Sequence, residues 1–508
     1  MSADTPSTST QPPPPPGPPT GAPPPLERPE LTPSQLALAL TAGLIAALLL
    51  PYREVGIALV LSGFAVAAAV VASRRGDDAG AFGGDPWRWT FAANALALSV
   101  LPTVTDAAWV LALTAPASAG LGLLAVGGGR TWLGTVAPVL RTVLVTFTGL
   151  GAASRAIQRA VPSGARWGRH VRTGLVTTAL LLVFGGLFRS ADAAFAGLLD
   201  AVIPELSLDS LLLRVVIGGI FASGSLTLLL SRSRPDDDLT RVPTSSLAGS
   251  EWIVPLATLV GLFAAFVLVQ AGTLFGGDAL VQRTSGLTYA AYAREGFGQL
   301  LTVAILTLGV VAVASRYAAP RDERDARLRR GLLAALCGLT LVVLVSAFQR
   351  LSLYEAAFGF TRDRVTAHAT IVWIGVLFVL VVVLGAWRRS EHLPRAAVAW
   401  TGLALLIFGM VQPDAIVARL NVERFEATGE LDVWLLSTLS ADAAPAIAEL
   451  PAEVRACVSH RGWSYGGSPE RLALPDDPLE WNRSRAVARQ LPAAPDVPCQ
   501  EPAGGSSP

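Results

Sequence analysis

TAHATIVWIGVLFVLVVVLGAW, residues Thr366–Trp387, carries no Asp, Glu, Lys or Arg over its whole length. A helix of about 20 apolar residues crosses the hydrocarbon of a bilayer and satisfies each backbone N–H and C=O group within the segment. This stretch is therefore predicted to be a membrane-spanning helix.

Similar apolar runs recur along the chain and predict about eleven spans in all. The others are Ser34–Pro51, Val55–Ser73, Trp89–Val104, Ala107–Gly127, Thr173–Phe188, Leu211–Leu230, Trp252–Phe275, Phe297–Ala314, Gly331–Phe348 and Ala396–Val411. The predicted fold class is all-α, a polytopic integral membrane helix bundle. A small extracytoplasmic helical tail is expected to follow it.

The composition excludes an ordinary soluble globular enzyme. Of the 508 residues, 52% are hydrophobic and 15% are charged, and the formal net charge is +1. All 39 basic residues are Arg. Without lysine there is no Walker-type phosphate lysine, no Schiff base and no lysine general base.

The segment Thr131–Gly151 is apolar but has Arg141 near its middle. Trp132, Val136 and Phe147 fall on one helical face, away from Arg141, which predicts an amphipathic helix lying in the membrane interface. A twelfth, tilted span remains the alternative.

The arginines set the expected orientation, since short cytoplasmic loops carry the positive excess. With Thr131–Gly151 in the interface, most arginine-rich loops face inward, the N-terminus is cytoplasmic and the C-terminus is extracytoplasmic. The predicted regions are a disordered Pro-rich tail (1–33), N-terminal transmembrane helices (34–127), a cytoplasmic interfacial helix with an Arg-rich linker (128–172), a transmembrane core (173–412) and an extracytoplasmic tail (413–508).

Two cysteines fall in the extracytoplasmic tail. Cys457 and Cys499 would face an oxidising compartment, so we expect them to pair, although two free thiols remain the alternative. Ile416, Val417, Leu420 and Phe425 offer one apolar side of a helix at the start of this tail.

Ionisable and polar residues gather at the outer ends of the later spans. Those from Arg350 to Arg364, including Arg362, are expected to fill an outer loop, and Asp414 and Asn421 follow the last span. They form either structural ion pairs or a shallow pocket that holds an anionic group. The candidate ligand-binding residues are Arg189, Asp192, Tyr292, Arg294, Glu295, Arg350, Tyr354, Glu355, Arg364 and Asn421.

No catalytic set, metal site or cofactor is indicated by the motifs. The four histidines, His170, His368, His392 and His460, lie in separate segments without ligand spacing. Gly120, Gly122 and Ala125 match a dinucleotide-binding spacing, but they lie inside an apolar run, where small residues serve helix packing.

Several short strings occur in a fixed order at these outer ends. They are Ser190-Ala191-Asp192 with Phe195; Tyr292 to Phe297 with Gln299; Arg350-Leu351, Leu353-Tyr354 and Phe358-Gly359 with Thr361 and Arg364; Asn421; and Ser440-Ala441-Asp442-Ala443 with Pro445. From about Leu175 to Pro445 the chain resembles the uncharacterised bacterial multi-pass membrane families known as domains of unknown function 4173 and 4153. The resemblance implies a bacterial plasma-membrane protein and adds no reaction.

Three functional hypotheses follow. The first is a membrane sensor, scaffold or accessory component, which is not an enzyme. The second is a transporter or lipid-handling protein whose outward pocket binds an anionic headgroup through Arg294, Arg350 and Arg364. The third is a membrane enzyme on a lipid-linked substrate with Glu295, Glu355 or Asp363 as base. The expected partners are the bilayer, an anionic lipid or another membrane protein, and no nucleic acid. The absence of Lys and the abundance of Ala, Arg and Gly indicate G+C-rich coding, typical of actinobacteria.

Overall fold

The computed structural model describes residues 33–50, 56–72, 85–127, 213–214, 217–222, 224–225, 249–275, 289–317, 322–460, 477–492 and 497–499. The predicted interfacial helix at Thr131–Gly151 and the predicted span at Thr173–Phe188 lie outside the described residues. So do residues 1–32 of the predicted Pro-rich tail and half of the predicted span Leu211–Leu230.

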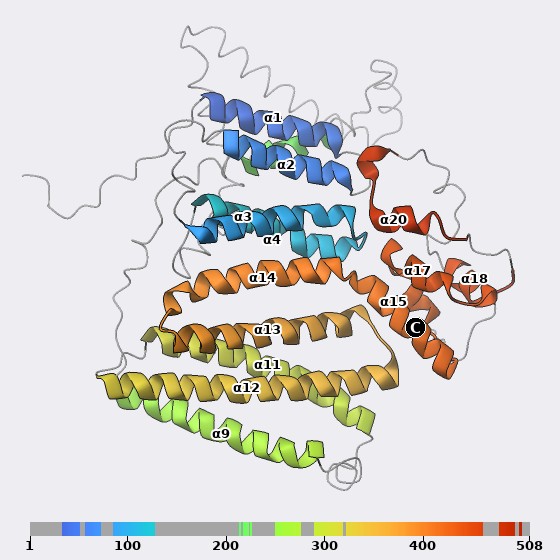
Figure 1. Cartoon of the computed structure of the whole chain (residues 1–508). Coiled ribbons are helices and arrows are strands. Elements are labelled where there is room, and N and C mark those ends of the chain that lie inside the picture. Colours follow the sequence, from blue (N-terminus) through green and yellow to red (C-terminus); the bar gives the residue numbers. More distant parts are fainter. Residues whose placement is uncertain are drawn as a thin grey trace, which may run out of the picture.

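Long helices lie roughly side by side in a stack, from α1 and α2 at one edge to α9 at the other (Figure 1). Every regular element among the described residues is a helix, which confirms the all-α class. The long helices are α1 (Pro33–Leu49), α2 (Ile57–Ala72), α3 (Pro86–Val100), α4 (Ala108–Gly127), α9 (Gly249–Phe275), α11 (Tyr289–Tyr317), α12 (Glu323–Phe358), α13 (Arg362–Ala386) and α14 (Leu393–Met410).

Four segments of the described chain are long and apolar enough to cross a membrane: Ala108–Val126, Glu323–Ala356, Arg362–Ala386 and Ser390–Met410. Shorter apolar helices occupy Ser34–Leu49, Ile57–Ala72, Ile253–Leu268 and Leu300–Ser315. These helices fit a membrane protein. The count of about eleven spans stays a prediction.

The long helix α12 corrects one expectation. Arg350, Tyr354 and Glu355 lie on its last turns and do not fill an outer loop. The helix ends only at Gly359, whose φ of +79° suits a residue without Cβ and whose N–H bonds to the Glu355 carbonyl at 2.8 Å. The side chain of Thr361 then caps α13, so the connection between the two helices is very short.

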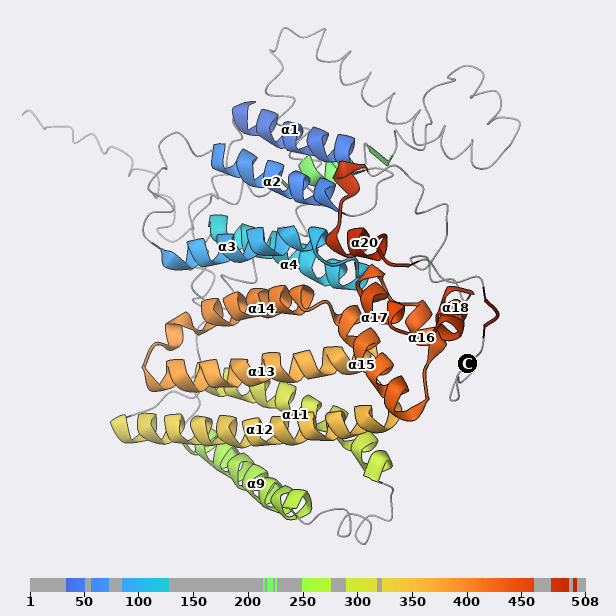
Figure 2. The same ribbon diagram turned by 45° about the vertical axis from the view of Figure 1, so that its right-hand side comes forward.

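The C-terminal residues fold into a unit of short helices against one end of the stack (Figures 1 and 2). It comprises α15 (Pro413–Thr428), α16 (Val433–Ser437), η4 (Ala441–Ala443), α17 (Ala444–Ala448), α18 (Ala452–His460), η5 (Pro478–Glu480) and α20 (Arg483–Ala488). Its core includes Val417, Leu431, Leu436 and Ile447, all almost completely buried.

Two predictions for this tail can be compared with the structure. The predicted apolar side of Ile416–Phe425 lies on α15, with Val417 fully buried and Phe425 partly buried in the core. Cys457 on α18 is joined to Cys499 by a disulfide with Cα atoms 4.7 Å apart. In the chain-entropy model, closing a loop of this length stabilises the fold by about 3–4 kcal/mol.

Two glycines let α14 approach α4 and the 3-10 turn η1 (Leu101–Thr103) that follows α3. A Cβ added at Gly402 would lie 2.7 Å from a methyl group of Leu121, and one at Gly409 would lie 2.7 Å from a methyl group of Leu101. Glycine at these positions therefore permits the close helix contact.

Gly402→Val should lower the stability of the bundle by about 1–3 kcal/mol, because the added methyl groups overpack a filled contact. Gly385→Val on α13 is the matched control, since a Cβ at Gly385 meets no atom within 4 Å. Thermal unfolding in detergent measures both variants. Equal melting temperatures for the two would contradict the close contact at Gly402.

Candidate functional site

The carboxylate of Asp414 lies where the bundle meets the C-terminal unit, and its side chain is completely buried. Arg362 donates to it twice, from Nε at 2.7 Å and from NH2 at 2.6 Å. Trp109 Nε1 donates at 3.2 Å and the N–H of Ser440 at 2.9 Å. One carboxylate thus joins α4, α13, α15 and the segment before η4.

Opposing effects act on the acidity of this group. Burial alone would raise the pKa of Asp414, but the hydrogen bonds from Arg362 and Ser440 and the charge of Arg362 outweigh it, and the pKa falls below its ordinary value of 3.8. Asp414 is therefore ionised at neutral pH and acts as a permanent anionic anchor.

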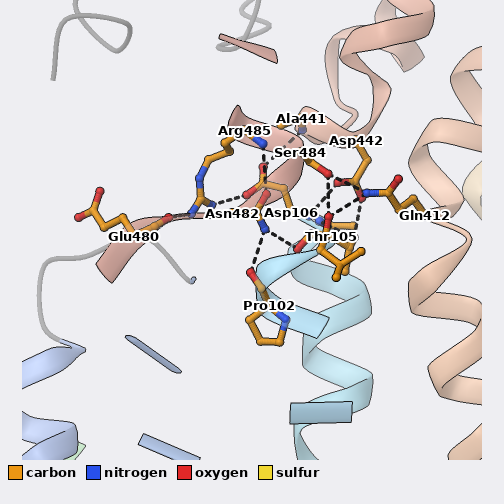
Figure 3. A network of polar contacts seen from close by, with 12 residues as sticks. Pro102, Thr105, Asp106, Gln412, Ala441, Asp442, Glu480, Asn482, Ser484 and Arg485 are labelled. Carbon is orange, nitrogen blue, oxygen red and sulfur yellow. Dashed lines mark hydrogen bonds and ion pairs between the residues drawn. The ribbon is translucent and has the colours of Figure 1, made fainter. Parts of the chain in front are cut away.

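A second polar network lies nearby, between the α3–α4 connection and the C-terminal helices (Figure 3). Asp442 accepts from the hydroxyl of Thr105 at 2.5 Å and from the N–H of Asp106 at 2.8 Å. The guanidinium of Arg485 donates to Asp106 at 2.5 Å, and both side chains are nearly buried. Asn482 donates to the carbonyls of Pro102 and Thr105 at 2.9 and 3.0 Å.

The pKa of Asp442 shifts in the opposite direction from that of Asp414. Burial raises it and the charge of Asp106 adds to the rise, while hydrogen bonds with Ser484, Thr105 and the N–H of Asp106 only partly offset these effects. The arginine in this network pairs with Asp106, so Asp442 has neutral hydrogen-bond donors and a like charge beside it.

Asn421, a predicted binding residue, forms hydrogen bonds with the backbone of the α12–α13 connection. Its Oδ1 accepts from the N–H of Phe360 at 3.2 Å, and its Nδ2 donates to the carbonyls of Phe360 and Val417, each at 2.8 Å. A Cβ at Gly359 would lie 3.0 Å from Asn421 Oδ1, so the positive φ and the close approach both require glycine there.

Arg364 and Tyr354, two further predicted residues, contact each other at the same connection. The guanidinium carbon of Arg364 lies 4.2 Å from the centroid of the Tyr354 ring, a cation–π arrangement. Arg364 also donates to the carbonyls of Phe358, at 3.0 Å, and of Gly359. Its donors thus stabilise the end of α12.

Glu355 contacts His368, one of the four histidines without metal-ligand spacing. His368 Nδ1 lies 3.2 Å from Glu355 Oε1, and His368 Nε2 lies 3.2 Å from Ser352 Oγ. Glu355 is 4% exposed. The separation of 13 residues between Glu355 and His368 gave no motif, because the contact arises from the antiparallel packing of α12 against α13.

The other predicted residues are not brought to these contacts within the described part of the chain. Arg350 lies half-buried on α12. Tyr292, Arg294 and Glu295 lie on the first turns of α11, and their side chains are outside the described residues. Arg189 and Asp192 also fall outside them.

Sequence reasoning missed Asp106, Asn482 and Arg485, since each meets its partner across hundreds of residues. The string Ser440–Ala443 was one usable signal, because it contains Asp442. Arg362 and Asp414 were placed at neighbouring outer ends, but nothing in their spacing indicated a direct pair.

The two buried aspartates should respond differently to loss of charge. Asp414→Asn removes the negative charge that pairs with Arg362. Breaking a buried pair costs about 3–5 kcal/mol, and we expect about 2–3 kcal/mol here because 31% of the Arg362 side chain is exposed. Asp442→Asn should cost less than about 1 kcal/mol at pH 7, because the amide oxygen still accepts from Asp106 and a like charge is removed.

The pH dependence provides the measurement. Stability from Asp414 is present above the unfolded pKa of about 3.8 and is lost as the pH falls through the lower folded pKa. Stability from Asp442 is present below about pH 3.8 and is lost as the pH rises through its higher folded pKa. Melting curves from pH 3 to pH 8 test this. A larger loss in Asp442→Asn than in Asp414→Asn at pH 7 would contradict the assignment.

Comparison with known proteins supplies a family but no activity. No curated protein and no solved structure matches the chain. A family model described as a domain of unknown function, DUF4153, matches residues 92–450. The match begins within α3 and so extends further toward the N-terminus than the resemblance expected from about Leu175. It also covers α4, which supplies Trp109 to the Asp414 site. Because the match spans well over half of the sequence and ends just beyond the η4–α17 segment, the chain belongs to the DUF4153 family.

Proposed function

We propose that this protein is a membrane scaffold or accessory component that holds its C-terminal helical unit in a fixed position at one end of the bundle and presents it to a partner. The observation that carries this proposal is the completely buried carboxylate of Asp414, which accepts from α4, α13 and the C-terminal unit together. A mobile appended tail would not need a buried charge at its junction.

The proposed setting is a bacterial plasma membrane crossed about eleven times. The N-terminus is cytoplasmic and the C-terminal unit lies outside. The arginines at the ends of α12, α13 and α14 away from the C-terminal unit support this orientation, since the positive-inside tendency places such groups in the cytoplasm. They include Arg324, Arg327, Arg329, Arg330, Arg388, Arg389 and Arg395.

The contacts of two predicted binding residues, Arg364 and Asn421, and of the neighbouring Arg362 support a structural role for them. Arg364 donates to two backbone carbonyls, Arg362 is paired with Asp414, and Asn421 clamps Phe360. A residue whose donors are already used inside the chain has fewer left for an anionic headgroup. These contacts favour the scaffold over a headgroup pocket built from Arg364.

The C-terminal unit offers an aromatic side chain to a partner. Trp434 at the start of α16 is 54% exposed, while Val433 beside it is 3% exposed and anchors the helix in the core. Tryptophan is enriched at protein interfaces because its large ring buries much area at little entropic cost.

A cross-linking experiment tests this function. Trp434 is replaced by the photoreactive residue p-benzoylphenylalanine, and native membranes are irradiated. We expect a discrete protein adduct that falls at least fivefold when Asp414→Asn is added, because the unit then loses its fixed position. Limited proteolysis checks that Asp414→Asn releases the C-terminal unit.

Glu430→Gln is the matched control, since the Glu430 side chain is 52% exposed and its pair with Arg424, at 2.5 Å, lies within the same unit. The adduct should persist in this variant. Adducts to lipid alone, or an adduct that is unchanged after the unit is released, would rule out the proposed presentation role.

A further inference from the structure

Three polar side chains form a continuous line at the contact between α12 and α13. Ser352 Oγ lies 3.2 Å from His368 Nε2, and His368 Nδ1 lies 3.2 Å from Glu355 Oε1. We propose that Ser352 is a nucleophile, His368 its general base and Glu355 a positioning residue, and that together they take the acyl group from a long-chain fatty acyl ester.

The two contacts of His368 fit a base and its positioning residue. Its Nδ1 faces the carboxylate of Glu355, and its Nε2 faces the hydroxyl of Ser352. In the proposed roles Nδ1 donates to Glu355 and Nε2 takes up the proton of Ser352. Ser352 also donates to the Phe348 carbonyl at 3.0 Å, and rotation of its single hydroxyl proton toward Nε2 prepares the attack.

The packing around the histidine holds it in place. The Phe348 ring meets the imidazole edge-on with centroids 4.3 Å apart. Ser352 and Glu355 are three residues apart on α12, so they lie on the same helical face. Glu355 is 4% exposed, the His368 side chain is 19% exposed and Ser352 is half-buried, so the buried member is the positioning carboxylate.

The depth of this group suits an acyl ester. Ser352 precedes the end of α12 by six residues, and His368 follows the start of α13 by six residues. At 1.5 Å per residue, both lie about 9 Å below the helix ends, where Arg362 and Arg364 are found. In the proposed orientation these helix ends lie at the level of the lipid headgroups, so the three side chains lie at the boundary between headgroups and hydrocarbon, where the ester bonds of lipids are found.

The proposed reaction has two balanced steps. Ser352 Oγ attacks the ester carbonyl carbon while its proton passes to His368 Nε2. The bond from that carbon to the alkoxy oxygen then breaks, and the leaving alcohol takes the proton from His368. Water, with His368 again as base, releases the fatty acid and restores the serine.

A covalent probe tests the nucleophile directly. Backbone N–H groups around Ser352 are used by the helix, so we expect slow turnover and choose labelling as the readout. The full chain in native membranes is treated with a long-chain alkyl fluorophosphonate, and the labelled peptide is mapped by mass spectrometry. The adduct should map to Ser352 and be lost in Ser352→Ala.

Further variants separate the roles. His368→Gln should slow labelling at least tenfold. Glu355→Gln should lower the maximal labelling rate while the probe concentration for half-maximal labelling stays unchanged, which loss of folded protein would not produce. Ser99→Ala is the matched control, because Ser99 is a half-buried helical serine bonded to a backbone carbonyl at 2.7 Å. Its labelling should equal that of the wild-type chain.

Ser352→Cys covers the case in which Ser352→Ala fails to fold. The thiol should accept the acyl group of p-nitrophenyl decanoate as a thioester that hydroxylamine cleaves. An unlabelled Ser352 in folded wild-type protein, or equal labelling rates in His368→Gln and wild type, would overturn the proposal. Neither result would affect the scaffold role, which is read out by cross-linking at Trp434.

Discussion

A buried charge is stable only when an opposite charge and hydrogen bonds inside the protein replace its contacts with water. At the junction between the bundle and the C-terminal unit, the buried carboxylate of Asp414 needs such partners. Its four hydrogen bonds come from three separate parts of the chain. Each donor has a fixed direction, so α4, α13 and the segment before η4 can meet α15 in essentially one arrangement. The position of the whole C-terminal unit depends on that arrangement.

The neighbouring network shows that burial alone does not make an aspartate a charged anchor. Asp442 and Asp414 are similarly enclosed, yet an arginine holds the pKa of Asp414 low, while burial and the Asp106 charge raise the pKa of Asp442. Asp414 accepts charge-assisted hydrogen bonds from Arg362 that hold the junction together. Asp442 shapes a hydrogen-bonded contact between the α3–α4 connection and the C-terminal helices.

The structure also explains why arginines lie near the C-terminal unit, on the predicted outer face. Arginines at a predicted outer face run against the positive-inside tendency and suggest a local use. Arg362 and Arg364 have such a use, the first with Asp414 and the second with the carbonyls at the end of α12. Their planar guanidinium groups suit this work, since several fixed donors can serve a carboxylate or adjacent carbonyls at once.

Apolar runs predicted the long helices of the described part of the chain, because the backbone of a segment such as Thr366–Trp387 can satisfy its hydrogen bonds in a bilayer only as a helix. The sequence also predicted the apolar side of Ile416–Phe425 and the family resemblance. The helix boundaries were harder to predict, because the polar residues Arg350, Tyr354 and Glu355 indicated a loop, although α12 continues to Phe358. The contacts between Asp414 and Trp109, Asp442 and Thr105, and His368 and Glu355 depend on how separate helices pack. A hydrogen bond between buried groups requires a suitable distance and direction in three dimensions. The spacing of the two residues along the sequence indicates neither.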